Sequence, residues 1–241
     1  MPSFLALLLL ALAPHPRAQE LVPAAGREAP VPPPGFHLVS ESARVSCWSR
    51  DKRFDAGKVE RRLERFERLL GARVPGRVHY YLHEHPADVY QATKRYAAGV
   101  AYPSLGIIHS IEKVHEHELV HLVSAQFGEP GLFFSEGLAV ALDDGGEWGG
   151  VSAKSAARAA LRKDPRLASL ERLTARFEWV DENAAYPLAG SFVKRLIDRH
   201  GIQAVVRFFR DARPPAWKEP FLAAFGETAD DAQAAWLKDL R

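Results

Sequence analysis

The chain has 241 residues, 47% of them hydrophobic, and a formal net charge of +2. This length predicts one domain of about 200 residues plus an extension, with enough apolar residues for a buried core. The single cysteine, Cys47, excludes an internal disulfide and a cysteine-rich metal site. Lys and Arg are dispersed among Asp and Glu, without the basic block and interleaved aromatic residues typical of nucleic-acid binding, so we expect no nucleic-acid partner.

The N-terminal segment differs from the rest of the chain. Residues 4–13 form an apolar run that is shorter than a membrane span of about 20 residues and matches the core of a secretory signal peptide. We therefore expect residues 1–18 to be a signal peptide, with cleavage after Ala13 or Ala18, and the protein to be secreted or periplasmic. No Lys or Arg precedes the run, so a buried helix or an uncleaved anchor is the alternative. Residues 19–35, rich in Pro and Ala, predict an extended linker, and no later stretch predicts a membrane span.

From residue 36 onward the pattern predicts strands alternating with helices. We expect strands at 36–48, 77–82 and 105–110, and helices at 56–70 and 86–96. The helix at 56–70 ends at Gly71 and has one apolar stripe, made of Val59, Leu63, Phe66, Leu69 and Leu70.

Residues 117–121 read His-Glu-Leu-Val-His. Residues four apart lie on one face of an α-helix, about 6 Å apart along its axis, so His117 and His121 can bind one metal ion. Glu118 lies roughly 100° around the helix, beside the metal, where a general base belongs. A helix is expected here because apolar residues follow helical spacing and Gly128 can end the run: Ile111, Val114, Leu119, Leu122 and Val123.

Two other histidines are expected to lie outside the ligand set. His115 precedes a glutamate, but the residue four positions later is Leu119. His109 lies on the strand expected at 105–110, and we expect its side chain to face the cleft or the surface rather than to bind metal.

A second apolar segment, residues 132–142, follows the turn at 128–131 and includes Glu136. Two antiparallel helices joined by this turn can bring the Glu136 carboxylate back to the two histidines. Because its neighbours are apolar, a buried Glu136 needs a partner such as a metal ion. Two imidazoles and one carboxylate bind zinc, although they also accept cobalt or manganese, and they leave a fourth position open as catalytic sites do.

The motif at 117–121 followed by Ser-Glu-Gly-Leu-Ala at 135–139 resembles the gluzincin metallopeptidases, the superfamily of thermolysin and aminopeptidase N. It is similar in particular to the small bacterial proteins called peptidase MA-like, over residues 77–241. This resemblance implies that Glu136 is the third metal ligand. It also implies that the strand before the metal-binding helix is a sheet edge, along which substrate pairs in extended form.

Residues 186–193 resemble the helix that, in aminopeptidase N relatives, presents a tyrosine to the tetrahedral oxyanion. The resemblance thus implies that Tyr186 donates to the transition state. The alternative is that Tyr186 only packs at the start of its helix.

Three features depart from the family. The interval between His121 and Glu136 is shorter than in thermolysin, and Val140 stands where relatives often place a carboxylate. No segment like the Gly-Ala-Met-Glu-Asn of aminopeptidases precedes His117, which argues against an exopeptidase. The carboxylate that orients a ligand histidine must then come from elsewhere, and three residues are candidates: Asp143, Asp144 and Asp181.

The remainder of the chain is expected to be mainly helical. The glycine-rich residues 143–150 predict a loop at the rim of the cleft. Helices are expected at 152–163, 185–200 and 202–211, with two more short helices reaching residue 240.

Together these features predict an α+β, zincin-like domain at 36–241, with a small mixed sheet, an active-site helix and a mainly helical C-terminal half. The expected function is zinc-dependent hydrolysis of a peptide or protein substrate. Its expected residues are the Zn²⁺ ligands His117, His121 and Glu136, the general base Glu118, and Tyr186 at the oxyanion. Two other functions stay open: a noncatalytic zinc-bearing domain that binds peptides or envelope partners, and a structural envelope protein that binds no metal. The oligomeric state stays open as well.

Overall fold

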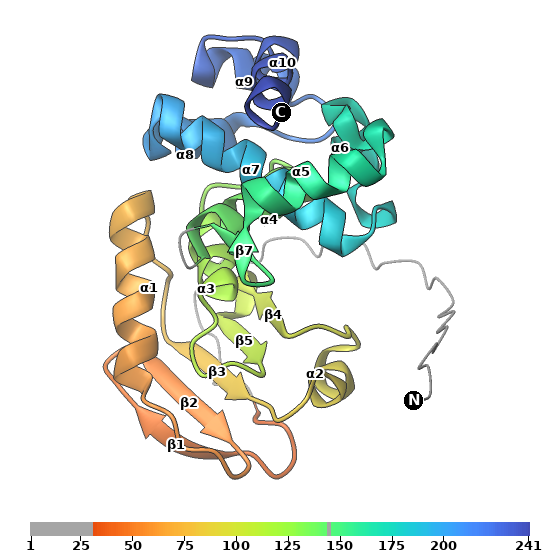
Figure 1. Ribbon diagram of the computed structural model, residues 1–241. Coiled ribbons are helices and arrows are strands. Elements are labelled where there is room, and N and C mark those ends of the chain that lie inside the picture. The colour runs from red at the N-terminus through yellow and green to blue at the C-terminus, as the bar shows by residue number, and fades with distance from the viewer. Residues whose placement is uncertain (1–30, 144–145) are drawn as a thin grey trace, which may run out of the picture.

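The computed structural model describes residues 31–143 and 146–241 (Figure 1). The expected signal peptide at 1–18, residues 19–30 of the expected linker, and Asp144 lie outside the described residues. In the described part of the chain, a small mixed sheet occupies one end and helices pack at the other (Figure 1). The predicted α+β class and mainly helical C-terminal half are thus confirmed. Across the same residues, no helix combines the length and the hydropathy that crossing a bilayer requires.

Five strands form the sheet in the described residues: β1 (His37–Glu41), β2 (Val45–Ser49), β3 (Val78–Leu82), β4 (Gly99–Tyr102) and β5 (Ile107–Ser110). Their order across the sheet is β1-β2-β3-β5-β4. The inner pairs β2–β3 and β3–β5 are parallel, whereas β1 and β4 pair antiparallel with their neighbours. The sheet therefore ends in β4 on the side that follows β5.

Two expectations about the strands are wrong. The single strand expected at 36–48 is a hairpin, because the chain reverses after Ser42, whose backbone N–H donates to the Val45 carbonyl at 2.9 Å. The strand expected at the sheet edge, β5, is not the edge, because β4 pairs antiparallel with its outer side. The sequence pattern did not predict β4. A strand as short as β4 is too brief for alternation to reveal it, and its partner is set by tertiary contact.

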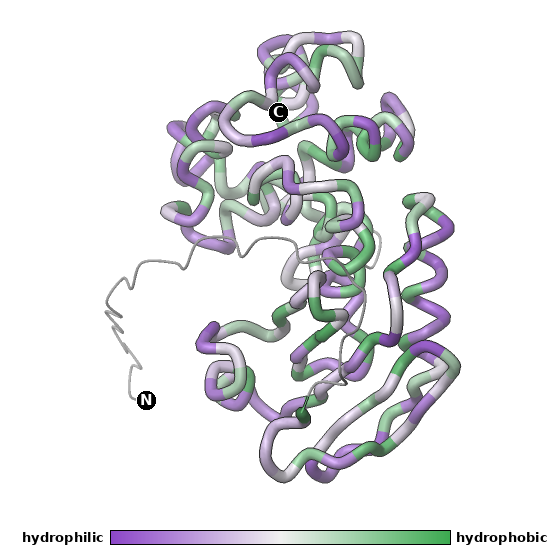
Figure 2. Tube along the Cα trace, turned by 180° about the vertical axis from the view of Figure 1, so that it is seen from behind, coloured by the Kyte–Doolittle hydropathy of each residue, from purple (hydrophilic) through white to green (hydrophobic). Residues whose placement is uncertain are grey.

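Helix α1 (Ala56–Leu70) packs against one face of the sheet and has the predicted bounds. Asp55 caps its start by accepting from the Gly57 N–H, and Gly71 ends it at a φ of 74°. Figure 2 shows hydrophilic and hydrophobic residues mixed along α1, because only one stripe of the helix faces the core. Helix α2 (Pro86–Thr93) ends earlier than expected because Lys94 adopts a φ of 60°.

Helices dominate the rest of the described chain. They are α3 (Glu116–Ser124), α4 (Leu132–Leu142), α5 (Ala153–Lys163), α6 (Leu170–Arg176), α7 (Glu182–His200), α8 (Ile202–Asp211), α9 (Lys218–Phe225) and α10 (Ala229–Asp239). Short 3₁₀ turns occur at Pro103–Leu105, Pro165–Ala168 and Phe177–Trp179. The bounds expected at 132–142 and 202–211 are confirmed, and α5 begins one residue after its expected start because Ser152 is its cap.

Three local features differ from expectation. Helix α7 begins before residue 185, because Asp181 caps it by accepting from the Asn183 N–H at 3.0 Å. Helix α6 was not expected. The loop expected at 143–150 contains one strand of a hairpin, β6 (Glu147–Trp148) with β7 (Val151–Ser152), whose turn residues Gly149 and Gly150 have φ values of 59° and 79°.

Helices α4 and α7 approach closely because each has a glycine at the contact. A Cβ atom on Gly137 would lie 2.7 Å from the Ala189 carbonyl oxygen, and one on Gly190 would lie 2.3 Å from Val140 Cγ1. Glu136 adjoins Gly137, and Tyr186 lies one helical turn before Gly190. The helix contact therefore brings the Glu136 and Tyr186 backbones toward the same region. The surrounding core is aromatic, with Phe133, Phe134, Phe192, Phe208, Phe221 and Trp236 fully buried.

Candidate metal-binding and catalytic site

The start of α3 is fixed by polar contacts to the sheet and to α1. The buried Glu116 carboxylate pairs with Arg62 at 2.8 Å and with Arg65 at 3.0 Å. The His115 backbone N–H donates to the Tyr80 hydroxyl at 3.0 Å, and the His115 Nδ1 lies 2.9 Å from the Ser110 Oγ. His115 is therefore occupied at the helix cap and is outside the ligand cluster, as expected.

Helix α3 is shorter than the apolar spacing indicated. Ile111 and Val114 precede its first turn, and Ala125 rather than Gly128 is its C-cap. The expected helical run from Ile111 to Gly128 is therefore wrong at both ends. The contacts of Ser110 and Glu116 hold the chain in a loop until the helix starts, a tertiary effect that periodicity does not contain.

Three side-chain atoms converge between α3 and α4. The His117 Nε2 lies 3.0 Å from the Glu136 Oε2, the His121 Nε2 lies 3.2 Å from the same oxygen, and the two Nε2 atoms are 3.1 Å apart. The side chains are 10%, 14% and 17% exposed for His117, Glu136 and His121, so the cluster is mostly buried but not closed to solvent. Among the described residues, this is the one group of histidine and carboxylate atoms with metal-ligand convergence.

The triangle has the size that a small divalent cation requires. Tetrahedral zinc with Zn–N and Zn–O bonds of 2.0–2.1 Å separates its ligand atoms by about 3.3 Å. The three observed separations, 3.0–3.2 Å, are close to this value. His117, His121 and Glu136 are therefore the residues that could hold a metal ion.

The electrostatics of the triangle also favour a cation. Burial lowers the pKa of His121, but the charge and hydrogen bond of Glu136 outweigh burial and raise that pKa to about 9. Burial raises the pKa of Glu136, yet the field of His121 and the hydrogen bond from His117 hold it well below its usual value. His121 therefore keeps its extra proton at neutral pH, and this proton supplies the positive charge of the triangle. A divalent cation can take the place of that proton.

Glu118 lies beside the triangle, between α3 and the edge strand β4. It is 7% exposed, and within the described residues no hydrogen bond or ion pair engages its carboxylate. Gly99 of β4 lies directly against Glu118 and His115, and no side chain fits between them. The edge strand of the sheet therefore runs next to the candidate base, and Gly99 is a site residue that sequence reasoning missed.

Tyr186 lies in a stack of rings above the triangle. Its ring stacks on His117, with centroids 6.1 Å apart and planes at 27°, and on Trp148, with centroids 4.8 Å apart and planes at 30°. Burial and the nearby Glu136 and Glu118 carboxylates raise the pKa of Tyr186, so its hydroxyl keeps its proton and can donate. Trp148, on the β6–β7 hairpin, is a second site residue that the sequence pattern did not predict. The glycines on both sides of it were the feature of the sequence that could have indicated it.

Of the residues considered as partners of the ligand histidines, Asp181 has another role, and the Asp143 carboxylate stays a candidate. Asp181 is exposed and caps α7, and the Asp143 carbonyl accepts from the Gly146 N–H at 2.7 Å. His109 neither faces the cleft nor lies at the surface. It is buried, its Nδ1 lies 2.9 Å from the His83 Nε2, and its ring stacks on Tyr81 at 4.9 Å. The expected surface position is therefore wrong, because the rings of Tyr81, His83 and Tyr102 cover His109, whereas it lies outside the ligand cluster as expected.

No protein-family model matches this chain, and no curated protein matches it. What the site can do chemically therefore follows from its geometry. That geometry includes three converging ligand atoms, a buried carboxylate beside them and a tyrosine hydroxyl that retains its proton.

Proposed function

We propose that this protein is a zinc-dependent hydrolase of the gluzincin type and that it cleaves peptide bonds. The observation that carries the proposal is the convergence of His117 Nε2, His121 Nε2 and Glu136 Oε2 within 3.0–3.2 Å of one another. These three residues would hold the ion, and the two nitrogens and one oxygen match a catalytic zinc set with a fourth position left open. When bound, zinc polarises a carbonyl and lowers the pKa of water to about 7.

The other side chains supply proton transfer and charge stabilisation. Glu118 accepts a proton from the attacking water and returns it to the leaving amine. Its carboxylate is suited to this role because it is buried next to the triangle without a competing partner among the described residues. Tyr186 keeps its proton and donates it as a hydrogen bond to the oxyanion that forms when the carbonyl is attacked.

The edge strand gives the substrate a place to lie. We expected substrate to pair with the strand directly before α3, but that strand, β5, has β4 as its neighbour. β4 is the terminal strand of the sheet in the described residues, and its Gly99 touches Glu118. An extended peptide that pairs with the open side of β4 would pass beside the candidate base. This is why we favour a peptide over a small ester as substrate.

The test combines metal content with proteolysis. Purified wild-type protein is expected to contain about one zinc per chain and to cleave a denatured protein library, with cleavage abolished by a chelator. Glu136→Gln should lose zinc, whereas Glu118→Gln should retain zinc and lose hydrolysis. Glu129→Gln is the matched control, because Glu129 is exposed on the turn between α3 and α4.

Two results would oppose the proposal. Equal zinc in the wild type and in a His117→Ala/His121→Ala variant would exclude the ligand set. Zinc binding at these residues without chelator-sensitive cleavage would instead support the noncatalytic zinc-bearing domain.

A further inference from the structure

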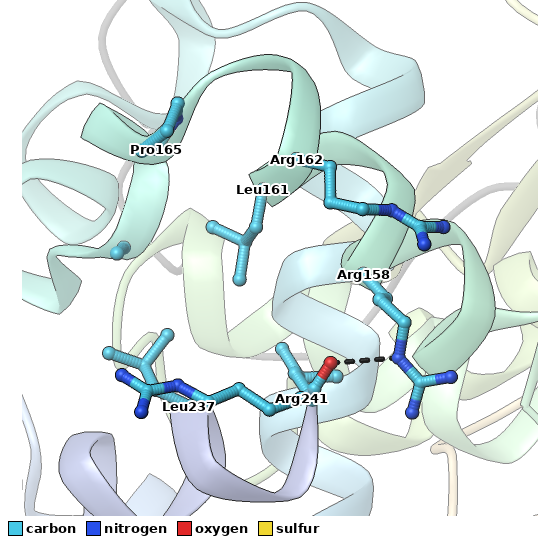
Figure 3. A pocket seen from close by; sticks show the side chains of 8 residues that line it. Arg158, Leu161, Arg162, Pro165, Leu237 and Arg241 are labelled. Atoms are coloured by element: carbon cyan, nitrogen blue, oxygen red, sulfur yellow. Dashed lines mark hydrogen bonds between the residues drawn. The ribbon is translucent and has the colours of Figure 1, made fainter.

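Two cavities lie side by side along helix α5. One, of about 400 Å³, is lined by Arg158, Leu161, Arg162 and Leu237 among others (Figure 3). The other, of about 460 Å³, lies between α5, α7 and α10. Both include Leu240 in their walls, so they are neighbours across the end of α10. We call these two neighbouring cavities together the α5 groove.

Helix α5 contributes three cations without ion-pair partners to the α5 groove, whereas the cations of α7 at the second cavity pair with Asp198, Asp239 and Glu227. Lys154, Arg158 and Arg162 are four residues apart in turn, so they form a stripe on one face of α5 along both cavities. None of the three forms an ion pair with a described residue. In contrast, the nearby cations Arg166, Lys194 and Arg195 each pair with an aspartate. Helix α5 is also the one α-helix in the described ranges that contains no Asp or Glu. Because the whole chain has a net charge of only +2, the positive charge on α5 is a local concentration.

Two arginines on the groove are held in place by hydrogen bonds within the protein. Arg195 of α7 donates from Nε to Asp239 at 2.8 Å, but its Nη1 is buried and has no acceptor within the described part of the chain. Arg158 donates from Nε to the Leu240 carbonyl at 2.7 Å, the dashed line in Figure 3, which orients its guanidinium beside the cavity. The Arg158 Nε–H is thus used within the protein and the Arg195 Nη1 is covered, so a carboxylate-bearing ligand would meet the exposed Lys154 and Arg162 and the outer part of the half-buried Arg158 guanidinium.

The apolar part of the groove narrows the class of ligand. Leu161 and Leu237 line the first cavity together with Arg158 and Arg162 (Figure 3). The aromatic residue of the second cavity, Trp236, is fully buried and donates its Nε1–H to Ser191, so it offers no face for stacking a base. Alternating charged and apolar contacts suit a peptide with acidic and aliphatic side chains better than a uniform phosphate polymer.

We propose that the α5 groove binds an acidic peptide segment in which Glu or Asp alternates with aliphatic residues. The groove reaches Gly146 and Ser152, at the base of the hairpin whose Trp148 stacks on Tyr186. A protein substrate held in the groove would therefore extend toward the hairpin at the catalytic cleft. This role as a substrate exosite rests on the proposed function, whereas the binding itself does not.

The proposal is tested by fluorescence anisotropy with the full chain. The probe is a fluorescein-labelled peptide of alternating Glu and Leu, compared with the same peptide carrying Gln in place of Glu. We expect the Glu peptide to bind at least tenfold more tightly, and Lys154→Glu/Arg162→Glu to weaken its binding at least tenfold. Both substituted residues are exposed, so the fold should persist. The matched control, Arg61→Glu/Arg68→Glu on α1, makes the same change in net charge at residues 67% and 72% exposed and should alter binding less than twofold.

Several outcomes would overturn the inference. These are equal binding of the Glu and Gln peptides, equal weakening by the two double variants, and tighter groove-dependent binding of inorganic polyphosphate. If the groove variant unfolds at a lower temperature, Arg162→Gln alone should still weaken binding at least threefold, and unchanged binding there would also overturn it. Because anisotropy needs no turnover, loss of this binding is distinguishable from failure of the proposed hydrolysis.

Discussion

Gly99 of the edge strand lies in direct contact with Glu118 of α3: a Cβ atom at position 99 would lie 2.8 Å from the Glu118 Cγ. The same atom would lie 2.3 Å from the His115 Nδ1, so an added methyl group collides with both residues. The two elements can approach only because residue 99 has no side chain. This contact places the candidate base next to the only strand of the described sheet that is open beside α3.

Gly99→Ala should therefore lower the rate of hydrolysis at least tenfold while the protein retains its zinc. The added methyl group displaces Glu118 and the cap residue His115 but does not touch the ligand triangle, and a displacement near 1 Å can reduce catalysis by about 10²-fold. Peptidase assays and metal analysis on the same sample measure the two effects. The control is Ala98→Val at the exposed neighbouring position, which should stay within twofold of the wild type. A fully active Gly99→Ala variant would contradict the assigned position of the base.

Tyr186→Phe should lower kcat by about 10²- to 10³-fold with little change in KM, the loss typical of removing one oxyanion donor. The phenylalanine ring preserves the stack between His117 and Trp148, so folding and zinc content should not change. Steady-state kinetics with metal analysis separate the hydroxyl from the ring. If kcat is unchanged, Tyr186 serves only in packing, which is the alternative that the sequence left open.

Gly190→Ala should destabilise the protein by about 1–3 kcal/mol, the usual effect of overpacking a core contact. Its new Cβ would lie 2.3 Å from Val140 Cγ1, so α4 and α7 must separate. Urea unfolding measures the free energy of unfolding. Gly57→Ala is the control, because its Cβ would face mainly the side-chain ends of Asp55 and Arg61, and it should be close to neutral. Since Glu136 lies on α4, the Gly190→Ala variant should also bind zinc more weakly. Unchanged stability together with unchanged zinc binding would contradict this prediction.

The buried pair of His83 and His109 should make stability depend on pH. Burial lowers the pKa of each ring from 6.5 to about 4. Between those values the unfolded chain binds more protons than the folded chain, so the free energy of unfolding falls as pH decreases from 6.5 toward 4. Each histidine contributes a slope of up to about 1.4 kcal/mol per pH unit in that window.

Urea unfolding at several pH values tests this dependence. His83→Gln removes one titrating ring and keeps an amide donor for the His109 Nδ1, so its slope should be smaller than that of the wild type. His85→Gln, at an exposed helix cap, is the control and should keep the wild-type slope. Equal slopes for all three proteins would mean that His83 is protonated in the folded state.

Local patterns in the sequence predicted the features that depend on short stretches of chain. The bounds of α1 follow from Asp55, Gly71 and one apolar stripe, all within the helix or next to it. The four-residue spacing of His117 and His121 places both rings on one helical face whatever the rest of the fold does. The candidate ligands and the helical C-terminal half could be read from the chain for this reason.

Tertiary packing alone decided how those local elements meet. β4 is too short to show a period, yet its pairing with β5 makes it the sheet edge. Glu136 reaches the histidines because α4 packs against α3, and the two glycines between α4 and α7 bring Tyr186 to the same region. Trp148 reaches Tyr186 through a hairpin with two glycines at its turn. These contacts join residues far apart in the chain, and their free energies depend on shape and burial that periodicity and local propensity do not encode.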